Sequence, residues 1–208
     1  MPTHIYIGGG VSELTFVASA AAVSQFVPKP TGIQEGDLLA VFEWMSPVTT
    51  PVVPSGFASI EDTGVFSINV HSMLKVVDAS DVANSIEGTN ATVDRKLSFL
   101  FRPNDAIETV SVADKSEQAV SSGAVSDQAV LAASRSTPVL VFGAAGQVAA
   151  SPPVAVSSSP PFDLVEVVAG QLAAGFKLYN SAPADHANSA VHFGGVQYVF
   201  QSFSISVS

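Results

Sequence analysis

Cysteine is missing from all 208 residues of the sequence. Its absence excludes disulfide bridges, thiolate metal sites and cysteine nucleophiles. A chain of this length can bury a core large enough to fold without covalent crosslinks, and all-β domains of this size commonly form one unit. We therefore expect a single domain over residues 1–208.

Charge is also scarce, and positive charge most of all. Charged residues make up 12% of the chain, and 8 Lys and Arg stand against 18 Asp and Glu, which gives a formal charge of −10. This balance argues against nucleic-acid binding, which needs clustered cations to displace counterions from phosphate. The adjacent cations Arg95 and Lys96 are interpreted as solvated residues at a strand edge. So neutral a surface is compatible with burial against other subunits, and equally with an extracellular β protein.

Long apolar runs are missing as well. No stretch approaches the roughly 18 uninterrupted apolar residues that a membrane-spanning helix needs. Near the N-terminus, the apolar residues Ile5–Ile7 end at Gly8–Gly10, and no Lys or Arg precedes them. We therefore expect neither a signal peptide nor a membrane partner.

Sequence motifs of catalysis are absent too. The chain has no Gly-x-Ser-x-Gly elbow and no phosphate-binding loop. The two histidines that lie close in sequence, His186 and His192, are six positions apart across a predicted loop, and the spacing supplies no third ligand for a metal. We therefore expect no catalytic residue, no cofactor and no metal site.

The chain is instead rich in short strand-like segments, of which Leu38–Met45 is the clearest. A Gly36-Asp37 turn precedes this segment and a proline-rich loop follows it. Its nearly continuous run of apolar, β-branched and aromatic residues favours a strand buried on both faces. Glu43 interrupts the run and is interpreted as an outward-facing residue beside buried neighbours.

Further strands are indicated by alternating or β-branched runs that end at Gly, Pro, Asn or Asp. They are predicted at residues 3–8, 14–17, 57–60, 65–77, 97–101, 107–112, 128–132, 138–143, 164–168, 172–179 and 196–207. The last strand is expected to contain a bulge, because its apolar side changes phase between Phe200 and Phe203. Segments 149–161 and 180–189 are interpreted as loops. With no long helix, this pattern predicts an all-β fold: a two-sheet antiparallel β-sandwich with jelly-roll-like connections.

Six short motifs follow one another in a fixed order along the chain. They are Gly36-Asp37-Leu38-Leu39, Pro54-Ser55-Gly56-Phe57, Met73-Leu74-Lys75-Val76-Val77, Phe99-Leu100-Phe101-Arg102, Pro138-Val139-Leu140-Val141-Phe142 and Phe203-Ser204-Ile205. This order resembles a group of β-sandwich proteins of tailed-bacteriophage virions, which serve as head decoration proteins, head fibres, and tail or adhesin components. The resemblance implies a non-enzymatic virion protein, assembled in the cytoplasm of the bacterial host, and it carries over no catalytic residue.

Within this group we expect a capsid decoration or cement protein that binds and stabilises the outer capsid surface. Its partners would be the major capsid protein or other virion proteins, and further copies of itself in a homo-oligomer. The expected contact elements are an N-terminal arm, 1–12, and the loops 46–56 and 149–161. The candidate contact residues are Ile5, Tyr6, Pro47, Val48, Pro51, Val52, Pro152, Pro153 and Val154.

Two alternatives stay open. A tail or fibre adhesin that binds a host surface glycan would present a surface cluster of Trp44 with Tyr179 or Tyr198. A carbohydrate-active hydrolase would need two carboxylates that face each other across a groove. The glutamates considered for that pair are Glu43, Glu61, Glu108 and Glu166.

Overall fold

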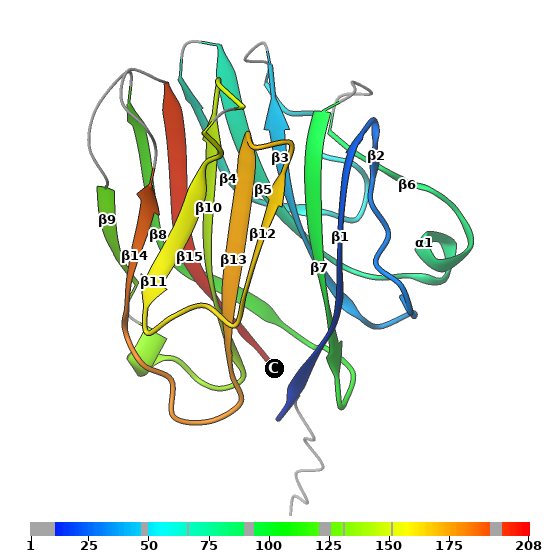
Figure 1. Ribbon diagram of the computed structural model, residues 1–208. Coiled ribbons are helices and arrows are strands. Elements are labelled where there is room, and N and C mark those ends of the chain that lie inside the picture. The colour runs from blue at the N-terminus through cyan, green and yellow to red at the C-terminus, as the bar shows by residue number, and fades with distance from the viewer. Residues whose placement is uncertain are drawn as a thin grey trace, which may run out of the picture.

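The structure is a computed structural model that describes residues 11–46, 50–65, 67–89, 94–120, 126–130, 132–150, 152–191 and 197–208. Two antiparallel five-stranded sheets form its main layers (Figure 1). The first sheet contains, in spatial order, β1 (Leu14–Ser24), β7 (Asp94–Pro103), β3 (Leu38–Met45), β5 (Ile68–Val76) and β4 (Ala58–Val65). The second contains β12 (Leu164–Val168), β13 (Leu172–Tyr179), β10 (Val139–Gln147), β15 (Tyr198–Val207) and β8 (Val110–Val120). The predicted two-sheet antiparallel sandwich is confirmed, whereas jelly-roll connections are not.

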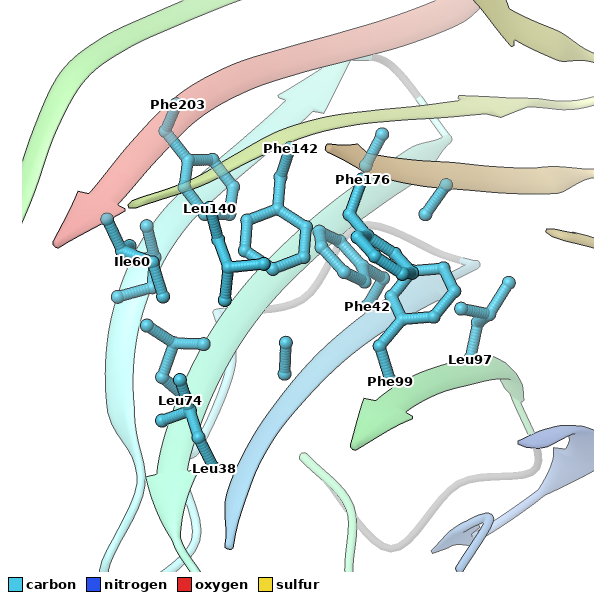
Figure 2. Close-up of a cluster of buried hydrophobic side chains, with 14 of the residues drawn as sticks. Leu38, Phe42, Ile60, Leu74, Leu97, Phe99, Leu140, Phe142, Phe176 and Phe203 are labelled. Atoms are coloured by element: carbon cyan, nitrogen blue, oxygen red, sulfur yellow. The ribbon is translucent and has the colours of Figure 1, made fainter. Parts of the chain in front are cut away.

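The space between the two sheets is filled by aromatic side chains from both of them (Figure 2). Its six central phenylalanines are Phe42, Phe99, Phe101, Phe142, Phe176 and Phe203, each at most 1% exposed. The rings of Phe101 and Phe176 meet edge to face, with centroids 4.8 Å apart and planes at 88°. Such edge-to-face contacts add to the free energy gained from burying the rings. The phenylalanine cluster therefore holds the two sheets together.

A smaller sheet covers the outer face of the second main sheet. It contains β11 (Ala155–Ser159), β14 (His186–Val191) and β9 (Ser126–Val130). Val156 of β11 and Ala190 of β14 pack against Tyr198 and Phe200 of β15. The segments 149–161 and 180–189, predicted as loops, therefore contain β11 and the first four residues of β14. The prediction failed because both strands consist mainly of small and polar residues. They pair antiparallel, and the hydroxyls of Ser157 and Ser189 lie 3.0 Å apart between them.

A second covering layer lies over the outer face of the first sheet. It contains the two-stranded pair β2 (Phe26–Val27) and β6 (Ile86–Glu87), and a short helix, α1 (Ala79–Ala83). Val27 and Ile86 pack against Leu39, Val41 and Leu100. All eight residues of β3 are consequently buried, as predicted for a strand covered on both faces. No helix within the described ranges is long and apolar enough to cross a membrane.

The apolar side of β15 changes phase because both of its faces are buried. Phe200 packs outward against the three-stranded sheet, and Phe203 packs inward among the central phenylalanines. The pairing of β15 with β10 runs without interruption. The pairing of β15 with β8 does contain an irregularity. Ser202–Ser204 of β15 lies opposite the longer segment Ala113–Ser116 of β8, so the extra residue belongs to β8. The bulge predicted in β15 is therefore wrong.

The first strand-like segment, residues 3–8, lies outside the described residues. The next one extends beyond the prediction, because β1 continues through an alanine-rich stretch to Ser24 and pairs with β7 along its length.

Replacing Phe142 by Ala should lower the free energy of unfolding by about 3–5 kcal/mol, because the sheets cannot close fully around the space left behind. Denaturation in urea, followed by tryptophan fluorescence, measures this change. Val52→Ala is the control, since Val52 is 70% exposed and its truncation should change stability by no more than about 0.5 kcal/mol. A Phe142→Ala loss below about 1 kcal/mol would show that the two sheets are not held together by this cluster.

Candidate functional site

A buried ion pair lies on the outer face of the first sheet. Glu43 of β3 and Lys96 of β7 occupy paired positions in adjacent strands, so their side chains point to the same face. Lys96 Nζ lies 3.3 Å from Glu43 Oε1 and 3.9 Å from Asp94 Oδ2, and the side chains of Glu43 and Lys96 are both 0% exposed. Glu43 does point outward, but the interpretation of Lys96 as a solvated residue is wrong. The covering layer, which the sequence did not reveal, removes both charges from water.

The backbone that follows β6 closes directly over this pair. A Cβ atom placed on Gly88 would lie 2.7 Å from Lys96 Nζ, so a side chain at this position would displace the ammonium. The backbone N–H of Thr89 donates to Glu43 Oε1 at 3.2 Å and to Glu43 Oε2 at 3.1 Å. The ion pair therefore attaches the covering layer to the first sheet through charge and backbone hydrogen bonds together.

His71 of β5 extends this network towards the surface. Its Nδ1 lies 3.2 Å from Thr89 Oγ1, and its Nε2 lies 2.9 Å from the hydroxyl of Ser59 on β4. Burial and, to a smaller extent, the positive charge of Lys96 together lower the pKa of His71 to about 4. Burial also raises the pKa of Glu43, against the opposing effect of Lys96 and the hydrogen bonds from Thr89. At neutral pH the imidazole is therefore uncharged.

The Ser59–His71 pair has the spacing of a nucleophile and its general base, but its surroundings oppose that chemistry. A general base must hold the proton that it accepts, and burial beside Lys96 disfavours the imidazolium. The group on Nδ1 is the hydroxyl of Thr89, whereas a serine hydrolase places a carboxylate there. We interpret the network as a structural connection between β4, β5 and the covering layer.

The aromatic cluster expected for an adhesin is not formed at the surface. Trp44 is 4% exposed, and its Nε1 donates to the carbonyl of Gln147 at 3.0 Å. The guanidinium of Arg95 stacks on the Trp44 ring at 4.3 Å, so Arg95 is not simply solvated as predicted. Tyr198 is fully buried under the three-stranded sheet, and the Tyr179 hydroxyl lies 2.8 Å from His186 Nε2.

The glutamates considered for a hydrolase are engaged with different partners. Glu43 pairs with Lys96, and Glu166 of β12 accepts a 2.7 Å hydrogen bond from Ser19. Glu61 Oε1 lies 3.5 Å from Lys115 Nζ. Glu108 is exposed ahead of β8.

Burial raises the pKa of Glu61, and the neighbouring charges of Glu117 and Asp62 add to this rise, while Lys115 opposes it. Nothing in the sequence pattern indicated that these acids gather on β4 and β8. In the parts of the chain that the structure describes, no group of three or more His, Cys, Asp or Glu could hold a metal ion.

Two of the predicted contact loops begin at the same end of the sandwich. Trp44 and Gln147, near the ends of β3 and β10, are joined by the indole hydrogen bond, and the segments that follow them are the predicted loops. Val52 is 70% exposed, and Pro51 is partly buried.

The remaining predicted contact residues are placed as follows. Pro152 and Pro153 are exposed ahead of β11. Val154 is only 1% exposed and packs in the cluster that contains Tyr198 and Phe200, so its side chain is not presented at the surface. Ile5, Tyr6, Pro47 and Val48 lie outside the described residues.

At the other end of the first sheet, several of the six motifs meet. Gly36 adopts a φ of +89° in the turn that begins β3, a conformation that favours glycine. Its N–H donates to the carbonyl of Val77 at 2.8 Å, and the N–H of Val77 donates to the carbonyl of Asp37 at 2.8 Å. The buried carboxylate of Asp37 accepts two 2.9 Å hydrogen bonds from Arg102, one to each oxygen. We call the contacts among Gly36, Asp37, Val77 and Arg102 the turn junction.

Beside the turn junction, the Pro-x-Gly-Phe motif packs on Lys75. The ammonium of Lys75 lies 5.6 Å from the centre of the Phe57 ring, and it forms ion pairs with Asp78 at 3.1 Å and Asp81 at 2.8 Å. A cavity of about 260 Å³ opens here. Asp78 and Asp81 already neutralise Lys75, so the cavity offers a ligand no unpaired positive charge.

The chain matches no protein-family model, no curated protein and no solved structure.

Replacing Lys96 by Met should lower the free energy of unfolding at pH 7 by about 3–5 kcal/mol, because Glu43 would remain buried without its cation. The double variant Glu43→Gln/Lys96→Met should recover at least about half of that loss, since Gln keeps an acceptor for Thr89 and removes the charge. Urea denaturation measures both. A double variant no more stable than Lys96→Met would mean that the damage comes from lost packing rather than from an unpaired charge.

The stability of the wild-type protein should fall between pH 6.5 and pH 4 because of His71. In the unfolded chain this histidine takes up a proton near pH 6.5, whereas in the folded chain it stays neutral down to about pH 4. The difference is worth up to about 3 kcal/mol at pH 4. Glu43 acts in the opposite direction, because its raised pKa lets the folded state bind a proton at a higher pH than the unfolded state.

Comparison with His71→Gln separates the two contributions, since the variant keeps Glu43. The stability of the variant should fall less steeply over this pH range, and the difference between the two curves is the contribution of His71. Parallel curves would show that His71 is not shielded from protons in the folded state. Stability is measured by urea denaturation at a series of pH values.

Proposed function

We propose that this chain is a non-enzymatic structural protein of a bacteriophage virion, and that it decorates the outer surface of the capsid. The observation that carries the proposal is the turn junction. The Gly-Asp-Leu-Leu motif, the end of the Met-Leu-Lys-Val-Val strand and the arginine of Phe-Leu-Phe-Arg contact one another there. These motifs carry the resemblance to virion β-sandwich proteins, and their meeting in space supports the view that they recur as one structural unit.

The distribution of charge also supports a structural role. The buried ionisable groups Glu43, Lys96 and Asp37 all find partners inside the fold. The predicted contact segments 46–56 and 149–161 contain no charged residue. A neutral contact surface can be buried against a capsid without the cost of removing charges from water. The remaining negative charge would keep the decorated particle soluble.

A decoration protein of this kind would stabilise the shell by bridging neighbouring capsid subunits. The rigid sandwich would hold the segments 46–56 and 149–161 in place, and the exposed residues Val52, Pro152 and Pro153 would contribute apolar surface to the contact. Preorganised segments lose little conformational entropy on binding, which favours attachment in many copies.

The test is a cryo-EM map of the virion whose genome encodes this chain. We expect density for the sandwich at regular positions on the outer capsid lattice. Density confined to the tail or fibres would overturn the decoration role and favour the adhesin alternative, which a glycan array would then examine. A virion without the chain would overturn both.

A binding assay with purified capsids that lack the chain tests the contact surface. Val52→Asp should weaken binding by at least about tenfold, because a carboxylate would be buried at the contact. Ala106→Asp is the matched control: Ala106 is exposed and lies by the turn junction, so the same charge should leave binding unchanged. Equal effects of the two substitutions would show that the added charge acts through long-range repulsion rather than at the loop.

A further inference from the structure

The two sides of the sandwich differ in how their edge strands are protected. On one side, β4 and β8 carry the acids Glu61, Asp62, Asp114 and Glu117 and the cation Lys115. Lys115 Nζ lies 3.5 Å from Glu61 Oε1, and Thr63 Oγ1 donates to Glu117 at 2.6 Å. Charged side chains and cross-sheet contacts of this kind prevent another strand from adding to an edge.

The opposite side is formed by β1 and β12, which belong to different sheets (Figure 1). The eleven residues of β1 and the five of β12 include a single charged side chain, Glu166, and no proline. Glu166 accepts the hydrogen bond from Ser19, which connects the two edges. Val165 and Val167 of β12 are 39% and 43% exposed. β1 itself therefore has neither the charged residues nor the proline that usually protect an edge strand.

The outer edge of β1 is open along most of its length. Ala18–Ser24 pairs continuously with β7 on one side, and among the described strands none pairs with β1 on the other. Ten of the eleven residues of β1 are partly or fully exposed. The backbone N–H and C=O groups of successive residues in a strand point to alternate sides. On the outer edge of β1, every second residue can therefore form backbone hydrogen bonds with a strand from another molecule.

We propose that two copies of the chain pair through this edge, with Ala18–Ser24 of one copy antiparallel to Ala18–Ser24 of the other. A two-fold axis makes the arrangement self-complementary, because each copy offers the same row of donors and acceptors. It joins the two first sheets into one sheet of ten strands. Because the far edge, β4, is protected by charge, assembly stops at the dimer and does not continue into a fibre.

The charge of the chain favours a second copy at this edge. Two molecules of formal charge −10 repel each other, and the repulsion is least where the facing surfaces are neutral. β1 itself carries no charge and has the single acid Glu166 beside it, whereas β4 and β8 would place several like charges face to face. The inference concerns the purified chain alone, so it does not rest on the proposed capsid role, and either can fail without the other.

The first test is sedimentation equilibrium of the full chain over a range of concentrations. We expect a reversible monomer–dimer equilibrium. Ala21, exposed in the middle of the pairing segment, is replaced by Lys or by Glu. Each variant alone should weaken dimerisation by at least about tenfold, because like charges meet across the two-fold axis, and an equimolar mixture should recover dimers. Ala58→Lys on the exposed opposite edge is the matched control and should dimerise like the wild type.

The second test locates the axis. Since the chain has no cysteine, a single spin label can be attached at Thr15, Ala21 or Val23 in separate variants. In an antiparallel pair, the distance between equivalent labels grows by about 7 Å for each residue from the axis, twice the rise per residue. The three measured distances should therefore fit one axis position within Ala18–Ser24.

Several outcomes would overturn the proposal. They are a monomer at every concentration, a dimer that Ala21→Lys leaves intact, a dimer that Ala58→Lys disrupts equally, and label distances that fit no single axis. Circular dichroism and urea denaturation of each variant exclude loss of folding as the cause of a monomer. A dimer whose label distances place β1 far from the axis would assign the contact to another surface and would also overturn the proposal.

Discussion

The pairing of Glu43 with Lys96 is the interaction on which the first sheet depends. β3 lies at the centre of that sheet and is covered on both faces, so each polar side chain on it needs a partner that the protein itself provides. Lys96 supplies the opposite charge, and Thr89 supplies two hydrogen bonds from the covering layer. Detachment of the covering layer would expose Glu43 and Lys96 to water and remove the hydrogen bonds from Thr89. The ion pair in turn stays buried only while the layer is attached. Sheet and cover are therefore mutually dependent.

The sequence predicted the sandwich because its central strands follow the simplest rule, a run of apolar and β-branched residues between turns. Leu38–Met45 and the hairpin at Leu164–Tyr179 are of this kind, and the structure confirms them. The rule failed where strands are built from small and polar residues, as in β11 (AVSSS) and β14 (HANSAV), since neither strand contains a run of large apolar residues. It also failed for the bulge, because a strand buried on both faces carries apolar residues in either phase.

The buried network of Glu43 and Lys96 could not be predicted from the sequence for a related reason. Glu43 and Lys96 lie 53 positions apart in numbering, and whether a charged residue on a strand meets water depends on what covers that face. The pattern correctly gave the direction in which Glu43 points, but β2 and β6 have only two residues each and leave no periodic signal. The predicted contact residues show the same limit of the sequence pattern. Val52 is exposed as expected, whereas Val154 is buried next to β11, a strand that the pattern did not predict.

Every strand pairing in the described structure joins partners from the same half of the chain, so residues 14–103 complete the first sheet and residues 110–207 complete the second. During synthesis the first sheet can form its hydrogen bonds before the second has left the ribosome, but its inner phenylalanines then face water. Among the described strands, those of the second sheet supply the surface that buries the inner phenylalanines of the first sheet. A chain that folds in this order joins the two sheets in a later docking step, and until that step the apolar inner face of the first sheet is exposed to aggregation.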